Sequence, residues 1–283
     1  TISIGAMIGS GIFVLPGLAA KIGGPAVILA YFLAGIVALP AALSKSEMAT
    51  AMPESGGTYL YIDRAMGPLM GTIAGIGAWF SLVFKSAFAL VGLGAYLLVI
   101  VSIPRGLVSV VALVLAVMLL VVNVVGVKQS GRLQAGIVTL VLIALGAFVA
   151  KGITEVDQAM FDPFFPTGSM GVLAATGFVF VSYAGVTKIA SVAEEVEDPG
   201  RNIPIGILGS IIFMMHVYTA IAFVIVGVSP MAELSQTLTP MALAAGRFLG
   251  DPGEIAVAAI AVLALTSMAN AGILSSTRFP LAM

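Results

Sequence analysis

The chain has 283 residues, of which 60% are hydrophobic and only 9% are charged, and its mean hydropathy is +1.17. An average soluble domain carries about 25% charged residues, so this composition predicts an all-α polytopic membrane protein whose solvent is the lipid bilayer. We expect a multi-pass protein of the plasma membrane. The net charge of -1 and the lack of a basic run exclude a nucleic-acid partner, and the absence of cysteine excludes disulfides, thiol catalysis and cysteine-ligated metal sites.

The first apolar segment, Thr1 to about Ala20, contains an unusual cluster of glycines. Three glycines fall within the seven residues from Gly5 to Gly11, and Pro16 follows. A glycine inside a helix costs roughly 1 kcal/mol relative to alanine, so a helix can be opened cheaply here. In hydrocarbon an opened backbone is tolerated only where it is buried in protein or lines a cavity. The stretch from Gly5 to Phe13 is therefore a candidate binding site.

Hydrophobic stretches long enough to cross roughly 30 Å of hydrocarbon, about 20 residues each, recur along the chain. About eight spans are predicted, at Thr1 to Ala20, Ala26 to Ser44, Leu69 to Ile100, Leu107 to Val125, Leu133 to Ala150, Met170 to Val192, Ile203 to Val228 and Ile255 to Ser276. The polar connection 44–66 is expected to hold a short amphipathic or re-entrant piece, and the connection 151–169 a surface helix. Because the chain starts without methionine inside an apolar segment, we expect an internal fragment truncated at both ends.

The sixth span is as irregular as the first. Gly177 and Gly185 flank its run from Phe178 to Ala184. Transporters built from inverted repeats place broken helices at corresponding positions of their two halves and hold the substrate between the freed backbone groups. The five-span separation predicts a first five-helix repeat over residues 1–151, and helices 6 to 8 of the second repeat over residues 152–283. The isolated glycines elsewhere are expected to permit close helix packing; they are Gly92, Gly94, Gly146 and Gly209.

Four motifs in a fixed order carry a resemblance to a known family. They are Gly5 to Phe13, the polar loop Glu47 to Tyr59 with its Pro-Glu-Ser-Gly-Gly run, Ala193 to Pro204, and Ser275 to Arg278. They resemble the amino acid permeases of the amino acid-polyamine-organocation (APC) superfamily, over essentially the whole chain. The resemblance implies the leucine-transporter-type inverted-repeat fold with broken helices 1 and 6. It also implies secondary active transport of small-molecule amino acids by alternating access, and we expect proton coupling.

An amino acid or polyamine exchanger, and a nontransporting amino acid sensor on the same fold, stay open as alternatives. An enzyme is not expected, because the single histidine, the lack of cysteine and the lack of a His-Glu-x-x-His motif leave no catalytic constellation inside the spans. A channel would need a continuous polar lining or a carbonyl filter, and no repeated filter segment occurs. The oligomeric state is not predicted.

The resemblance also implies where a substrate binds. Backbone amides of the first break would face the substrate carboxylate, which agrees with the positive end of a helix dipole there. Carbonyls of both breaks would accept hydrogen bonds from the substrate ammonium, and side chains of the sixth and third spans would set selectivity. The predicted substrate-binding residues are Met7, Ile8, Gly9, Ser10, Gly11, Ile12, Phe180, Val181, Ser182, Tyr183, Ala184 and Gly185.

Departures from the family pattern concern the coupling ion, which could be a proton or sodium. Some proton-coupled members carry a lysine in the fifth helix, where this chain has Val141. Sodium-coupled relatives use hydroxyls on the eighth helix, where this chain has Met268 and Gly272, although Ser267 is adjacent. A sixth-helix carboxylate of many members is replaced by Thr187. Neither coupling arrangement is fully present, and no cofactor or metal is expected.

Two lysines inside spans are unusual. Lys85 lies well inside the third span between Phe84 and Phe88, where an ionised lysine costs at least about 2.5 kcal/mol on insertion scales. Lys188 follows the sixth-helix break, although it could instead snorkel to the interface. We interpret Lys85 and Lys188 as coupling or gating candidates, together with Thr187 and Ser267.

Overall fold

The computed structural model describes residues 2–52, 57–101, 105–125, 131–185, 196 and 198–282, and nearly all of them are helical. Within this part of the chain, six helical stretches are long and apolar enough to span a membrane, and Val108–Val124 is a shorter apolar helix. The six stretches are Leu15–Ala51, Pro68–Ile100, Gln134–Glu155, Gly168–Gly185, Pro199–Val228 and Pro240–Ile273. The prediction of an all-helical, multi-pass membrane protein is confirmed.

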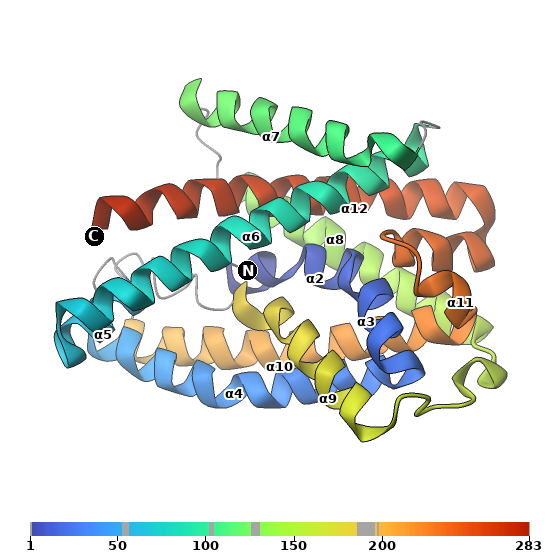
Figure 1. Cartoon of the computed structure of the whole chain (residues 1–283), viewed down its shortest axis with the longest axis horizontal. Coiled ribbons are helices and arrows are strands. Elements are labelled where there is room, and N and C mark those ends of the chain that lie inside the picture. Colours follow the sequence, from blue (N-terminus) through green and yellow to red (C-terminus); the bar gives the residue numbers. More distant parts are fainter. Residues whose placement is uncertain are drawn as a thin grey trace.

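The helices follow one another with short connections (Figure 1). They are α1 (Ile2–Met7), α2 (Ser10–Phe13), α3 (Leu15–Gly23), α4 (Val27–Ala51), α5 (Gly57–Met66), α6 (Pro68–Ile100), α7 (Val108–Val125), α8 (Gly131–Gly152), α9 (Gly168–Val179), α10 (Pro199–Val228), α11 (Met231–Leu234) and α12 (Pro240–Ala282). Proline stands at the first position of α6, α10 and α12, where its missing amide proton costs nothing. Within α12 the helix changes direction at Gly250, whose φ of 67° lies in the left-handed region.

The polar connections differ in part from the sequence-based expectation. Helix α4 continues to Ala51, beyond the predicted end at Ser44, and α5 supplies the expected short piece of the 44–66 connection. Between α8 and α9 the chain forms only 3-10 turns, at Ile153–Glu155 and Gln158–Phe161, so the predicted surface helix is wrong. Prolines at positions 163 and 166 explain the difference, because each removes a backbone donor and restricts the preceding residue to extended conformations.

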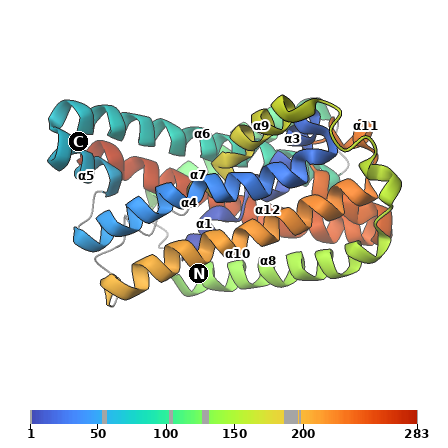
Figure 2. The same cartoon turned by 90° about the horizontal axis from the view of Figure 1, so that it is seen from below.

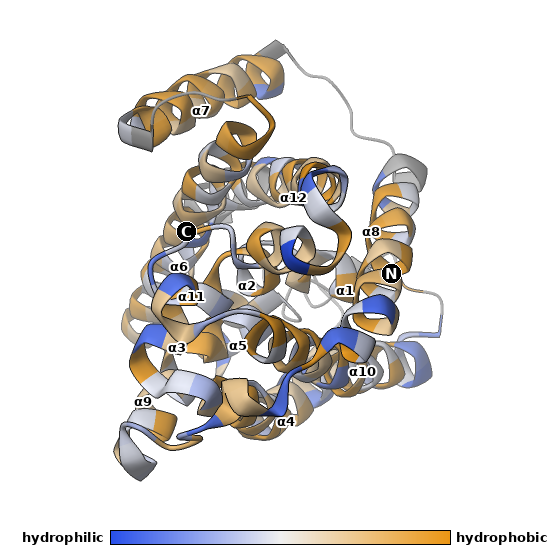
Figure 3. Ribbon diagram, turned by 90° about the vertical axis from the view of Figure 1, so that its right-hand side faces the viewer, coloured by the Kyte–Doolittle hydropathy of each residue, from blue (hydrophilic) through white to orange (hydrophobic). Residues whose placement is uncertain are grey.

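Two pairs of long helices frame the molecule. Helix α6 packs along α12, and α4 packs along α10. The short helices α1 and α2 lie between these pairs, in contact with α6, α8, α10 and α12 (Figures 1 and 3). Helix α8 packs against α10 and α12 (Figure 2), whereas α7 lies at the periphery beside α6. The N-terminal broken segment is therefore the element that the longer helices enclose.

The outer surface of the bundle is apolar. Figure 3 shows hydrophobic residues over the outward faces of α7 and α8. On α7, the side chains of Leu113, Val114 and Val124 are more than half exposed. In water such a surface would be unfavourable, but hydrocarbon is its natural solvent. The surface pattern thus agrees with membrane embedding.

Small residues let some of the helices approach closely. A methyl group at Gly92 of α6 would lie 2.5 Å from the Val14 side chain, and one at Gly94 would lie 3.0 Å from the Val108 carbonyl oxygen. The prediction of close packing is confirmed for these two glycines. It is wrong for Gly146 and Gly209, where no atom lies within 4 Å of the added methyl group.

Gly17 gives a test of this packing. A methyl group on Gly17 of α3 would lie 2.5 Å from the Thr237 carbonyl oxygen and 3.0 Å from the Leu234 carbonyl oxygen, both backbone atoms. Because backbone must move to make room, Gly17→Ala is expected to destabilise the protein by about 1–3 kcal/mol. The measurement is the melting temperature in detergent, and Gly209→Ala is the matched control that meets open space. Equal melting temperatures for the two variants would contradict the packing.

Candidate functional site

The first helix is interrupted at the predicted glycine cluster. Helix α1 ends at Met7 and α2 begins at Ser10, so that Ile8 and Gly9 lie outside regular helix. The Gly9 carbonyl oxygen accepts hydrogen bonds from the amides of Ile12 and Phe13, at 3.1 Å each. The chain resumes its helix after Gly9, and the interruption leaves the last carbonyls of α1 and the first amides of α2 without intrahelical partners.

A second irregular segment contacts the first. Helix α9 ends at Val179, and residues 180–185 form a 3-10 turn. A methyl group on Gly11 would lie 2.8 Å from the Ser182 side chain, and one on Gly185 would lie 2.1 Å from the Ala6 carbonyl oxygen. The two segments, about 170 residues apart in sequence, therefore touch at backbone distance, and glycine is required at both contacts.

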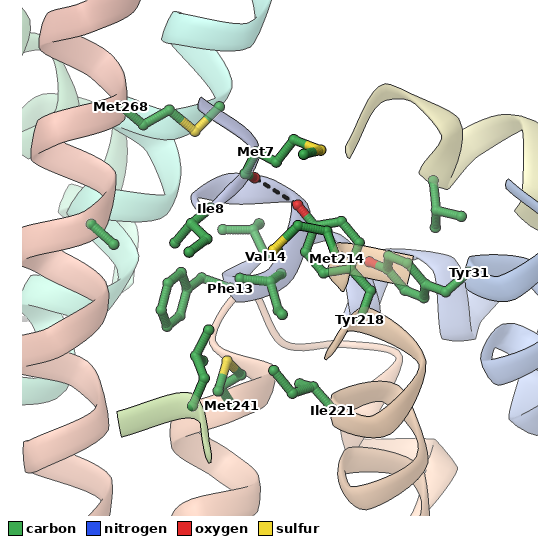
Figure 4. Close-up of a cluster of buried hydrophobic side chains, with 14 of the residues drawn as sticks. Met7, Ile8, Phe13, Val14, Tyr31, Met214, Tyr218, Ile221, Met241 and Met268 are labelled. Atoms are coloured by element: carbon green, nitrogen blue, oxygen red, sulfur yellow. Dashed lines mark hydrogen bonds between the residues drawn. The ribbon is translucent and has the colours of Figure 1, made fainter. Parts of the chain in front are cut away.

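Tyrosine hydroxyls pair with backbone carbonyls of α1 and α2. Each of three tyrosines from α4, α6 and α10 donates to one such carbonyl: Tyr218 Oη to Met7 O at 2.6 Å, Tyr31 Oη to Gly11 O at 2.7 Å and Tyr96 Oη to Phe13 O at 2.6 Å. Figure 4 shows the bond from Tyr218 to Met7 within the buried cluster. These three carbonyls thus have hydrogen-bond donors within the protein.

The second segment joins the same network. Tyr183 Oη donates to Tyr31 O at 2.8 Å, and Ser182 Oγ donates to Gly11 O at 3.4 Å. The ring centroid of Tyr218 lies 5.2 Å from that of Tyr183 and 5.7 Å from that of Tyr31. Sequence reasoning named Tyr183 and missed Tyr31, Tyr96 and Tyr218. Their position deep inside apolar spans could have identified them, because tyrosine in membrane helices usually lies at the membrane–water interface.

Two backbone amides that follow the first break donate hydrogen bonds within the protein. The Ser10 amide donates to Met268 Sδ at 3.2 Å, and Ser10 Oγ lies 3.7 Å from the same sulfur. The Ile12 amide donates to Gly9 O. Met268 also restricts position 9 to glycine, because a methyl group there would lie 1.9 Å from the Met268 sulfur. The thioether of α12 therefore fills the space beside the interruption (Figure 4).

A pocket of about 280 Å³ opens where the two segments meet α6. It is mainly apolar, with a few polar groups. Its lining residues are Ser10, Gly11, Leu15, Ser81, Phe84, Lys85, Phe88, Phe178, Val181 and Ser182. A concave apolar pocket with few convergent polar groups is the usual form of a small-molecule site.

The predicted site residues divide into three groups. Ser10, Gly11, Val181 and Ser182 line the pocket. A second group is buried nearby in the core without lining the pocket: Met7, Ile8, Ile12 and Tyr183 with the glycines Gly9 and Gly185. Ala184 is half-buried, and the Phe180 side chain is 38% exposed.

Sequence reasoning missed several lining residues. Ser81, Phe84 and Phe88 share one face of α6 with Lys85, at the i, i+3, i+4, i+7 spacing of a helix. That periodicity could have identified them, because it continues the face that Lys85 marks. Leu15 and Phe178 flank the two irregular segments and carried no signal of their own.

Lys85 projects toward the first interruption. Its Nζ donates to the Ala6 carbonyl oxygen at 3.3 Å, at the C-terminal end of α1. Oriented peptide dipoles make this end of a helix negative, so it attracts a cation. The lysine is thereby stabilised at membrane depth and faces the pocket at the same time.

The other coupling candidates are less informative. Ser267 Oγ donates to Gln134 Oε1 at 3.1 Å, and Val141 is buried in α8. Thr187 and Lys188 lie outside the described residues. Among the residues that the structure describes, no group of three or more His, Cys, Asp or Glu side chains could hold a metal ion.

Comparisons with known proteins agree on one family. The family model described as "Amino acid permease" matches residues 1–283. The branched-chain amino acid permease BcaP of Bacillus subtilis is 30% identical over the whole chain and 64% of its own length. The methylthioribose transporter of Bacillus subtilis is 29% identical over the whole chain and 65% of its own length. The branched-chain amino acid permease BcaP of Lactococcus lactis is 29% identical over 85% of the chain and 57% of its own length.

The chain spans just under two thirds of the length of these relatives, at most 65%. The family match nevertheless extends over all 283 residues. The apolar helices, the interrupted first helix and the full-length match agree with one another. The chain belongs to the amino acid permease family.

Proposed function

We propose that the protein is a secondary active transporter that moves amino acids across the plasma membrane by alternating access. The observation that carries the proposal is the pocket at the meeting point of the two irregular segments, lined by Ser10, Gly11 and Ser182. Backbone groups beside such interruptions, together with small hydroxyl side chains, can bind an amino acid without a dedicated charged cluster. The names of the relatives, permeases and transporters, point the same way.

The pocket wall fits substrates with an apolar side chain. Leu15, Phe84, Phe88, Phe178 and Val181 supply most of the lining. Two of the relatives are named for branched-chain amino acids. We therefore propose that amino acids with apolar side chains are substrates.

The proposal includes the leucine-transporter-type inverted repeat, with residues 1–151 as the first half and 152–283 as the start of the second, and with about eight spans in this chain. Two packing relations support it. The second long helices of the halves, α4 and α10, pack along each other, and so do the third, α6 and α12. Such pairing of equivalent helices is what a two-fold axis in the membrane plane would produce. Rocking of one helix bundle against the other around the pocket is the proposed transport movement.

Proton coupling is the proposed driving force. A sodium site between the first helix and α12 is not supported, because the Met268 thioether fills that space and Ser267 pairs with Gln134. Hard cations prefer oxygen ligands, whereas thioether sulfur suits soft metals. Lys85 and Lys188 are the proposed titrating groups.

Ion gradients test the coupling. Uptake of pooled radiolabelled amino acids into proteoliposomes is expected to rise several-fold under a pH gradient and to stay unchanged under a sodium gradient. Lys85→Ala or Lys188→Ala is expected to remove the pH stimulation, since each deletes a group that can carry the proton. Stimulation that persists in both variants would contradict the assignment, and stimulation by sodium alone would contradict proton coupling.

The contact between the two irregular segments gives a second test. Gly185→Ala places a methyl group 2.1 Å from the Ala6 carbonyl oxygen, so the segments must separate and the pocket must change shape. We expect uptake to fall by at least about tenfold, as a misplacement of about 1 Å can cost far more in a preorganised site. The matched control is Gly177→Ala in α9, where the methyl group meets open space. Equal uptake by the two variants would show that the contact does not matter for transport.

A further inference from the structure

Tyr218 of α10 contacts both irregular segments through one hydroxyl group. Its Oη donates to the Met7 carbonyl oxygen at 2.6 Å, at the end of α1, and to the Ser182 carbonyl oxygen at 3.4 Å, in the turn after α9. The shorter contact is the stronger hydrogen bond, because O–H···O bonds are usually about 2.5–3.0 Å long. A single side chain therefore connects the first interruption to the second segment.

The ring of Tyr218 adds to this connection. Its centroid lies 5.2 Å from that of Tyr183 in the second segment and 5.7 Å from that of Tyr31 in α4. These two tyrosines are hydrogen-bonded in turn, because Tyr31 Oη donates to Gly11 O at 2.7 Å and Tyr183 Oη donates to Tyr31 O at 2.8 Å. Each of the three side chains is 1% exposed. They form one buried tyrosine cluster that joins α4 and α10 to the two segments.

The segments that Tyr218 connects also form part of the pocket wall. Ser10 and Gly11 line the pocket from the first segment, and Val181 and Ser182 line it from the second. Tyr218 itself is buried and is not one of the lining residues. A shift of one segment against the other would therefore reshape the wall without any change of a lining side chain. A preorganised site is sensitive to a misplacement of about 1 Å.

Removal of the Tyr218 hydroxyl would alter these positions while the ring contacts stay in place. Phenylalanine keeps the aromatic ring, whereas the Met7 carbonyl loses the donor that lies 2.6 Å away. A buried carbonyl without a donor is unfavourable, so the backbone has to move toward another donor or admit a water molecule. Either response displaces the segment that carries Ser10 and Gly11.

We propose that Tyr218 is a positioning residue of the pocket, which sets substrate affinity by holding the first interruption and the second segment in fixed relative positions. It does so without touching the substrate. The inference rests on the proposed function in taking this pocket as the substrate site. Tyr96 offers a comparison, because its hydroxyl donates to Phe13 O at the same 2.6 Å and its ring packs against the Phe13 ring.

Transport kinetics of Tyr218→Phe test the proposal. The probe is radiolabelled leucine, whose side chain suits the apolar pocket wall, offered to proteoliposomes over a range of concentrations. We expect the half-saturation concentration to rise at least about tenfold, because the two segments no longer hold the pocket in its binding geometry. The maximal rate is expected to stay near the wild-type value, as for a change that weakens binding alone. A folded variant with an unchanged half-saturation concentration, or with a loss of maximal rate alone, would overturn the inference and leave the proposed function intact.

Two matched variants separate positioning from a general loss of stability. Tyr96→Phe removes a hydrogen bond of the same length, so its melting temperature in detergent is expected to fall by a similar amount. Its half-saturation concentration is expected to stay near the wild-type value, since the Tyr218 contacts are intact. Tyr61→Phe should match the wild type in both measurements, because the Tyr61 hydroxyl has no hydrogen-bond partner among the described residues. An equal rise in half-saturation concentration for Tyr96→Phe and Tyr218→Phe would overturn the inference.

Tyr183→Phe provides the same test from the second segment if Tyr218→Phe does not fold. It removes the hydrogen bond to Tyr31 O, so we expect a higher half-saturation concentration here too. The leucine concentration that gives half of the full rise in melting temperature measures binding without transport, and it should increase in parallel. No increase in Tyr183→Phe would overturn the inference. Failure of the wild type to take up any amino acid of the pooled set would count against the proposed function instead.

Discussion

Each backbone carbonyl freed by the interruption of the first helix has to find a donor without help from bulk water. An unsatisfied carbonyl costs several kcal/mol in hydrocarbon, so an opened helix persists only where other side chains pair with it. Tyr218 meets this requirement for Met7 O at the end of α1, and Tyr31 and Tyr96 donate to the Gly11 and Phe13 carbonyls of α2. Helices α4, α6 and α10 each bring one tyrosine hydroxyl within hydrogen-bonding distance of this N-terminal segment.

The same constraint explains why the pocket has so few charged groups. Most of the backbone polar groups near the interruption are hydrogen-bonded inside the protein, to tyrosine hydroxyls, to Ser182 and to the Met268 sulfur. Among the described residues, the polar side chains that line the pocket are Ser10, Ser81, Lys85 and Ser182, and aromatic and aliphatic side chains surround them.

The candidate site was predictable in part. The glycine cluster located the interruption after Met7, and the glycines at 177 and 185 marked the segment that turns to 3-10 helix, because the backbone cost of glycine is a local property. Of the named residues, Ser10, Gly11, Val181, Ser182 and Lys85 do line the pocket. The tyrosine network and the aromatic wall were missed, since their roles depend on which helix faces come together. Thr187 and Lys188 stay predictions, because they lie outside the described residues.

The sequence by itself determined the class of the protein. A chain with 60% hydrophobic and 9% charged residues must place its helices in a membrane, and the glycine positions fix where a helix can open. Only the tertiary structure decided what the opened segments contact. Met268 faces the Ser10 amide and Lys85 faces Ala6 because α12 and α6 pack around the first helix with particular faces inward. Those orientations come from packing among residues far apart in sequence, which local patterns do not encode.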